Sequence, residues 1–155
     1  MPVLDGDGKT VRIIAGSILG ASSPVQTSSP MFYADAILTT GASLPLDPDY
    51  DERAIYTISG EVEIAGDVFP AGQLLVFRPG DRITIRARND ARFMMLGGEP
   101  MDGPRFIWWN FVSSRQDRIE QAKADWKAAR FDTVPSDEVE FIPLPEQPPP
   151  PVSYP

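Results

Sequence analysis

The chain has 155 residues, a formal net charge of −8, seventeen prolines, and neither cysteine nor histidine. Without cysteine there is no disulfide, iron–sulfur cluster or thiolate nucleophile, and without histidine there is no imidazole-bound metal or Ser-His-Asp triad. The acidic balance argues against direct contact with nucleic acid or an anionic membrane surface, because both favour a basic patch.

The length predicts one compact domain, large enough to fold without a disulfide or a metal. The first residues, MPVLDGDGKT, are polar and have no signal-peptide core. No apolar run in the chain reaches the roughly 20 residues that span a bilayer. We therefore expect a cytoplasmic protein that contacts no membrane.

Short segments rich in β-branched and aromatic residues recur along the chain, separated by turn signals such as Pro79-Gly80. In residues 82–88, Ile83 and Ile85 alternate with arginines, which predicts a strand with one apolar and one cationic face. This pattern is typical of an all-β sandwich or barrel with mostly antiparallel strands. The predicted strands fall within residues 11–16, 32–40, 53–59, 61–69, 73–78, 82–88, 91–96 and 105–112.

The segment from Gly41 to Gly60, GASLPLDPDYDERAIYTISG, has the spacing of a metal-binding β-barrel motif. The ligand positions of that motif hold Asp47, Asp49 and Arg53. Oxygen ligands at positions 47, 49 and 51 also resemble the start of a calcium loop, but Glu52 and Ile58 stand where that loop needs Gly and Glu. We interpret the segment as a solvated acidic turn, with weak binding of a hard cation as the alternative.

Helical periodicity occurs once, over residues 115–130, where Ser114 and Asp117 resemble a capping box. This predicts a helix whose apolar stripe, including Trp126, packs on the barrel. Trp108 and Trp109 precede it on a predicted strand and should point to opposite faces. Residues 132–155 lose periodicity and end in PLPEQPPPPVSYP, which predicts an extended tail. The domain division expected is therefore 1–131 for barrel and helix, and 132–155 for the tail.

Several of these segments resemble the C-terminal half of a pirin, a member of the cupin superfamily. The likeness covers about residues 11–146 and rests chiefly on Gly97-Gly98-Glu99-Pro100, on Phe111-Val112, and on the helix sequence QAKADW followed by ARF. The resemblance implies a single antiparallel jelly-roll β-barrel of cupin type, with one C-terminal helix and a proline-rich tail. Where many relatives place Gly-Pro before Phe-Val, this chain has Trp109-Asn110.

A typical pirin has about twice this length and two barrels, a size that fits two domains. In the family the N-terminal barrel holds the metal, usually iron, on three histidines and a glutamate, and the C-terminal barrel generally lacks these ligands. Some members show quercetin dioxygenase activity, and others act as transcriptional cofactors. The resemblance places the present chain in the second barrel.

Against the general cupin motif, Asp47, Asp49 and Arg53 occupy the positions of His, His and Glu, and the histidine of the second motif falls near Ile83. An arginine keeps its positive charge at ordinary pH, so Arg53 would repel a metal and pair with Asp47 or Asp49. We therefore predict no catalytic residue, no metal and no cofactor. These four positions remain as a ligand pocket to be tested.

Three functions follow as hypotheses. The first is a metal-free, non-catalytic domain with a structural or interaction role, which forms a homodimer or pairs with another cupin domain. The second is binding of a small organic anion in the barrel mouth, with Arg53 meeting the anion. The third is a subunit or fragment of a quercetin 2,3-dioxygenase-like pirin whose metal site lies on another barrel.

Overall fold

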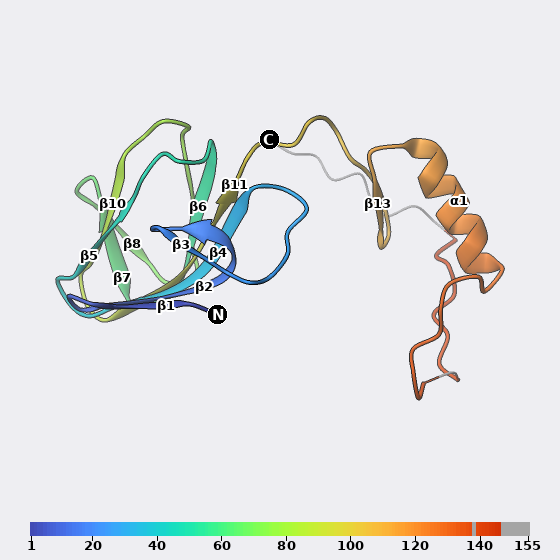
Figure 1. Ribbon diagram of the computed structural model, residues 1–155, viewed down its shortest axis with the longest axis horizontal. Coiled ribbons are helices and arrows are strands. Elements are labelled where there is room, and N and C mark those ends of the chain that lie inside the picture. Colours follow the sequence, from blue (N-terminus) through green and yellow to red (C-terminus); the bar gives the residue numbers. More distant parts are fainter. Residues whose placement is uncertain (138, 147–155) are drawn as a thin grey trace. The chain divides into compact units, whose positions relative to one another are not determined.

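The computed structural model describes residues 1–137 and 139–146. The chain divides into two compact units, Met1–Pro100 and Met101–Pro155, and each is described by itself (Figure 1). We call residues 1–100 the sandwich unit and the described part of residues 101–146 the helical unit. In the described residues no helix is long and apolar enough to cross a membrane.

The sandwich unit consists of two antiparallel sheets. The larger has the strand order β1-β2-β4-β11-β6-β9, with β3 paired to β2, and the smaller has the order β5-β10-β7-β8. This confirms the predicted antiparallel jelly-roll fold. The strands are β1 (Val3–Gly6), β2 (Lys9–Ile18), β3 (Ala21–Ser22), β4 (Met31–Leu38), β5 (Ser43–Leu46), β6 (Glu52–Ser59), β7 (Glu61–Ile64), β8 (Asp67–Pro70), β9 (Leu74–Phe77), β10 (Ile83–Ala87) and β11 (Ala91–Gly98).

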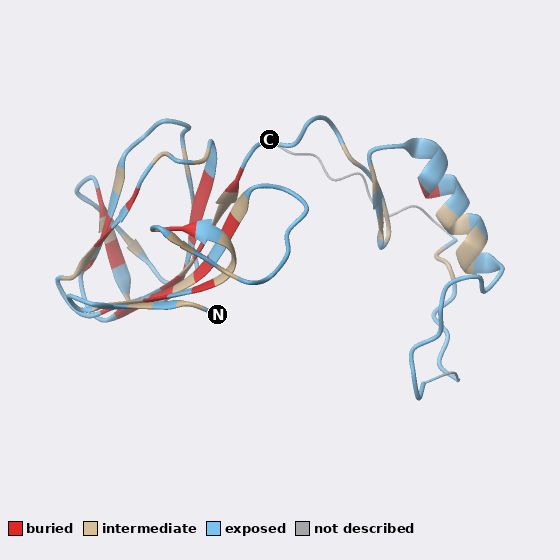
Figure 2. Cartoon of the chain, in the orientation of Figure 1, coloured by how far each residue is buried: buried red, intermediate tan, exposed pale blue. Residues whose placement is uncertain are grey.

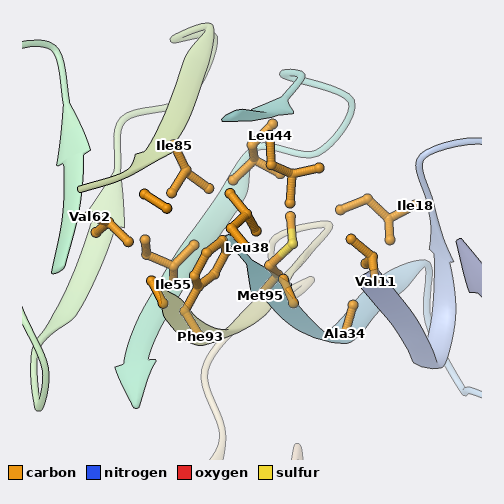
Figure 3. Packing of buried hydrophobic residues seen from close by; sticks show 14 of the residues in the cluster. Val11, Ile18, Ala34, Leu38, Leu44, Ile55, Val62, Ile85, Phe93 and Met95 are labelled. Carbon is orange, nitrogen blue, oxygen red and sulfur yellow. The ribbon is translucent and has the colours of Figure 1, made fainter. Parts of the chain in front are cut away.

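The core of the sandwich unit lies between the inner faces of the two sheets. Ile55 and Phe93 project from the larger sheet, and Val62 and Ile85 project from the smaller one (Figure 3). All four are fully buried, since successive side chains of a strand alternate between core and solvent. Figure 2 shows how the buried positions concentrate in these strands.

A tight turn divides a segment that the sequence pattern predicts to be one strand. Residues 61–69 are not one strand but the hairpin β7–β8, closed by Ala65 and Gly66 with φ of 53° and 93°. Two successive positive φ angles are what the type I′ form of a two-residue hairpin turn requires. The sequence pattern also did not predict β5, an edge strand whose Pro45 cannot donate a ladder hydrogen bond.

The helical unit contains β12 (Phe106–Trp108), β13 (Phe111–Ser113) and α1 (Gln116–Lys127). The prediction of one strand over 105–112 is wrong, because Trp109 adopts a φ of 50° and reverses the chain. The prediction that Trp108 and Trp109 separate to opposite faces is therefore also wrong. Both rings contact Phe111, and Trp109 meets Trp126 edge-on at 5.1 Å.

The helix begins without the expected capping box. Its N-cap is Arg115, which forms no side-chain cap, and the guanidinium of Arg115 instead pairs with Asp117. After the helix, the Trp126 indole donates a hydrogen bond of 2.9 Å to the carbonyl of Ile142. The end of the proline-rich segment, residues 147–155, lies outside the described residues, and the division at residue 131 stays a prediction.

Candidate functional site

The two glycines that bound the motif segment act as turn residues. Gly41 and Gly60 have φ of 83° and 76°, a region that favours glycine. A Cβ at Gly60 would lie 2.3 Å from the carbonyl oxygen of Asp90, so a side chain has no room there. The spacing of the two glycines is thus explained by the turns that they form.

Arg53 lies inside the sandwich unit. It is the second residue of β6, and alternation along that strand places it on the inner face together with Ile55 and Thr57. Its exposed fraction is only 1%. Charged side chains are seldom buried so deeply without partners. The role of Arg53 therefore follows from the groups that its guanidinium contacts.

Three backbone carbonyls accept hydrogen bonds from the guanidinium. Nη1 donates to the carbonyl oxygens of Leu46 at 3.2 Å and Asp47 at 3.3 Å, and Nη2 donates to the carbonyl oxygen of Arg78 at 3.0 Å. Leu46 and Asp47 mark the end of β5, whereas Arg78 follows β9. Arg53 therefore links the loop between β5 and β6 to the loop between β9 and β10.

The predicted ion pair of Arg53 with a carboxylate is wrong. Asp47 and Asp49 are exposed, and Arg53 forms no salt bridge within the described part of the chain. The carbonyl of Asp47, not its carboxylate, accepts the hydrogen bond. The physical reason is that the carboxylates stay hydrated in the loop, while carbonyls at strand ends need a donor once they are buried.

Two polar atoms of the inner face have no hydrogen-bond partner among the residues that the structure describes. These are Nε of Arg53 and Oγ1 of Thr57, both buried. An unpaired buried polar group costs on the order of 1–3 kcal/mol. The inner face of β6 is therefore polar at two positions that a typical sandwich would fill with apolar side chains.

Ile83, the remaining candidate position, is the first residue of β10 and pairs with Leu46 of β5. The structure thus brings Ile83 and Arg53 to the same end of the sandwich unit, through Leu46, and leaves the Asp47 and Asp49 carboxylates in solvent. An alkyl group, a cation and two exposed carboxylates do not fit an iron site. Among the described residues, no cluster of three His, Cys, Asp or Glu side chains could hold a metal.

Two pockets of the described residues lie away from these positions. One, of about 290 Å³, is lined mainly by residues of β1 and β2 with Leu44 and Pro45. The other, of about 660 Å³, belongs to the helical unit, where Lys123 lies 4.9 Å from the Trp108 ring.

The sequence pattern did not identify Arg78 as a partner of Arg53. Arg78 contributes a backbone carbonyl, which every residue type carries.

Comparison with known proteins supports this architecture. Residues 33–132 match the family model described as the pirin C-terminal cupin domain. A pirin-like protein of Caulobacter vibrioides is 48% identical over 146 residues, 94% of this chain and 50% of that protein. Pirin of Homo sapiens is 33% identical over 138 residues, 84% of this chain and 47% of that protein.

A crystal structure of a quercetin 2,3-dioxygenase from Acinetobacter baumannii is also similar. Its TM-score is 0.78 at 28% identity, with 94% of this chain and 51% of that chain covered. The present chain thus spans about half the length of the curated relatives that it matches. What those whole proteins do need not reside in the half that is matched here.

Proposed function

This chain belongs to the pirin family, where it matches the C-terminal cupin domain, and we propose that it acts without a metal and without catalysis, through contacts with other protein. The observation that carries the proposal is the buried guanidinium of Arg53, which occupies a ligand position of the cupin motif. Self-association and a cytoplasmic location stay predictions of the proposal.

The electrostatics of this position support the absence of a metal. A divalent cation beside Arg53 would face a fixed positive charge, and repulsion between buried charges is weakly screened. The carbonyls of Leu46, Asp47 and Arg78 already accept hydrogen bonds from the guanidinium. Arg53 thus performs the structural part of what a metal would do, because it ties two loops together at one end of the sandwich unit.

A second candidate is favoured by the half-length match. The chain covers 51% of a protein named quercetin 2,3-dioxygenase, so an activity of that kind could rest on a second domain that supplies the metal ligands. In that case the present domain is one part of a two-domain enzyme. Binding of an organic anion by Arg53 is less well supported, because the guanidinium would first have to release the loop carbonyls.

An oxygen-uptake assay with quercetin tests the proposal. The purified chain is incubated with Fe(II) and then supplied with oxygen and quercetin, beside an Arg53→Met variant and a reaction with Fe(II) alone. We expect all three to consume oxygen at the same rate. Turnover by the wild-type chain that Asp47→Asn or Asp49→Asn abolishes would show a working site and overturn the proposal.

A further inference from the structure

The loop between β5 and β6, residues 47–51, connects the two sheets at the Arg53 end of the sandwich unit. β5 is an edge strand of the smaller sheet, and β6 lies in the larger one. We call this segment the Tyr50 loop. Three of its residues are exposed aspartates, Asp47, Asp49 and Asp51, and like charges so close together repel one another. The charges of the loop therefore do not hold it against the sheets, and another contact must fix its position.

Tyr50 attaches the middle of this loop to the larger sheet. Its hydroxyl donates a hydrogen bond of 3.1 Å to the backbone carbonyl of Ser17 in β2. Its ring is part-buried and lies 5.3 Å, between centroids, from the ring of Phe32 in β4. β2 and β4 are neighbours, and β11 separates β4 from β6. The side chain thus reaches across the end of the larger sheet, and both of these partners belong to the sandwich unit.

The ring that Tyr50 contacts belongs to the same row of the sheet as Arg53. Phe32 pairs with Gly97, and Gly97 pairs with Arg53. Paired residues project from the same side of a sheet. Gly97 has no side chain, and a Cβ there would lie 2.6 Å from the Phe32 ring. The Phe32 ring therefore occupies the space over Gly97, and Tyr50 packs at the end of the unit that holds the buried guanidinium.

The guanidinium of Arg53 is only partly satisfied while the loop is in this position. Its Nη1 donates to the carbonyls of Leu46 and of Asp47, the first residue of the loop. Its Nε is buried and has no partner in the described part of the chain. A buried donor without a partner disfavours the closed position of the loop, because water would accept its hydrogen bond in an open one. The contacts of Tyr50 oppose this opening.

We propose that the Tyr50 loop is a lid over Arg53, that Tyr50 is its latch, and that opening admits water or another small hydrogen-bond acceptor to Nε. The structure shows the lid closed. A segment held at its middle by one side chain opens with less free energy than unfolding of the whole unit requires. The lid goes beyond the proposed function and can fail separately from it, because its contacts do not depend on the absence of a metal.

Exchange of the Arg53 Nε–H proton with water, followed by NMR on the whole chain, tests the lid. We expect slow exchange at Arg53, which is 1% exposed, and rapid exchange at Arg78, whose side chain is 91% exposed. Urea below the unfolding transition should leave the Arg53 rate nearly constant, since a small opening exposes little surface. The backbone N–H of the buried Met95, in the inner strand β11, should exchange faster as urea rises, because its exchange requires unfolding of the sheet.

Variants of Tyr50 test the latch. Tyr50→Phe removes only the hydroxyl and should speed exchange at Arg53 Nε about five-fold, and Tyr50→Ala also removes the ring and should speed it about 50-fold. The matched control is Tyr33→Phe, the same change at a side chain that is 37% exposed, which should leave the rate unchanged. Ile85→Val, at a fully buried side chain of the smaller sheet, should speed exchange at Met95 but not at Arg53.

Three results would each overturn the lid. The first is exchange at Arg53 Nε as fast as at Arg78, which would show no closed state. The second is the same urea dependence at Arg53 and Met95, which would show no separate opening. The third is an unchanged rate at Arg53 in Tyr50→Ala. None of them bears on the proposed function, which iron-dependent turnover of quercetin would remove whether or not the loop opens.

Discussion

The two faces of β6 depart from a typical strand in opposite ways. The inner face carries the charged Arg53 and the hydroxyl of Thr57, each at most 1% exposed, whereas the outer face carries Tyr56 and Ile58, each more than 40% exposed. An antiparallel sheet with one solvated face would place polar groups outside and apolar groups inside. Departures of this kind are expected where a residue serves something other than the core. We attribute the inner one to the closure of two loops by Arg53.

The largest expected effect on stability comes from removing the buried charge of Arg53. Arg53→Met removes the hydrogen-bond donors of one buried and two part-buried carbonyls and should lower the free energy of unfolding by about 2–4 kcal/mol. Urea denaturation measures this. The control is Arg78→Ala, because Arg78 contributes its carbonyl and its side chain is 91% exposed. That variant should change the free energy by less than about 0.5 kcal/mol, and equal effects of both would contradict the role given to Arg53.

Thr57→Val should act in the opposite direction. The hydroxyl of Thr57 is buried and has no partner within residues 1–137 and 139–146, so its replacement by a methyl group of similar size should stabilise the sandwich unit by about 1 kcal/mol. The exposed Thr84 of β10 provides the control, since Thr84→Val removes a hydrated hydroxyl. A clear destabilisation by Thr57→Val would contradict this prediction, because it would mean that the hydroxyl makes a stabilising hydrogen bond.

The outer face should tolerate changes that the inner face does not. Val76→Thr, at a side chain that is 74% exposed, should alter the free energy of unfolding by less than about 0.5 kcal/mol. Ile55→Val, at a fully buried side chain of the neighbouring strand, should cost about 1 kcal/mol. These measurements need protein dilute enough to be monomeric. The comparison between the faces fails if Val76→Thr costs as much as Ile55→Val under those conditions.

The smallest effect concerns the end of the sandwich unit opposite Arg53. The backbone N–H of Thr40 and then its hydroxyl donate to the carboxylate of Asp90 and hold the pKa of Asp90 below its ordinary value of 3.8. Because the pKa is lowered on folding, the stabilisation is present above about pH 4 and is lost as the pH falls through the folded pKa. The stability difference between wild type and Asp90→Asn should therefore shrink on acidification. A constant difference down to pH values well below that pKa would contradict this contact.

The sequence predicted the fold where a pattern reports directly on burial. On β10, Ile85 and Ala87 are buried and Arg86 is exposed, as alternation requires. It failed at residues 109–110, because tryptophan is not a residue that signals a turn. The hairpin follows from a backbone angle of Trp109 that no residue preference indicates.

The candidate site was predictable only in part. The spacing from Gly41 to Gly60 located Arg53 in the motif, and its positive charge excluded a role as metal ligand. Its partners could not be predicted, because the acceptors are main-chain carbonyls that every residue carries. The neighbours of Tyr56 on the outer side of the larger sheet also escaped prediction, since they depend on the register of strands that are distant in sequence.

Metal analysis of the purified chain tests most directly whether Arg53 has replaced a metal. The chain is produced with iron in the medium and is then measured for iron, manganese, zinc and calcium after gel filtration. We expect no metal in proportion to the protein, in the wild-type chain or in Arg78→Ala. One tightly bound iron per chain, retained through gel filtration, would contradict it.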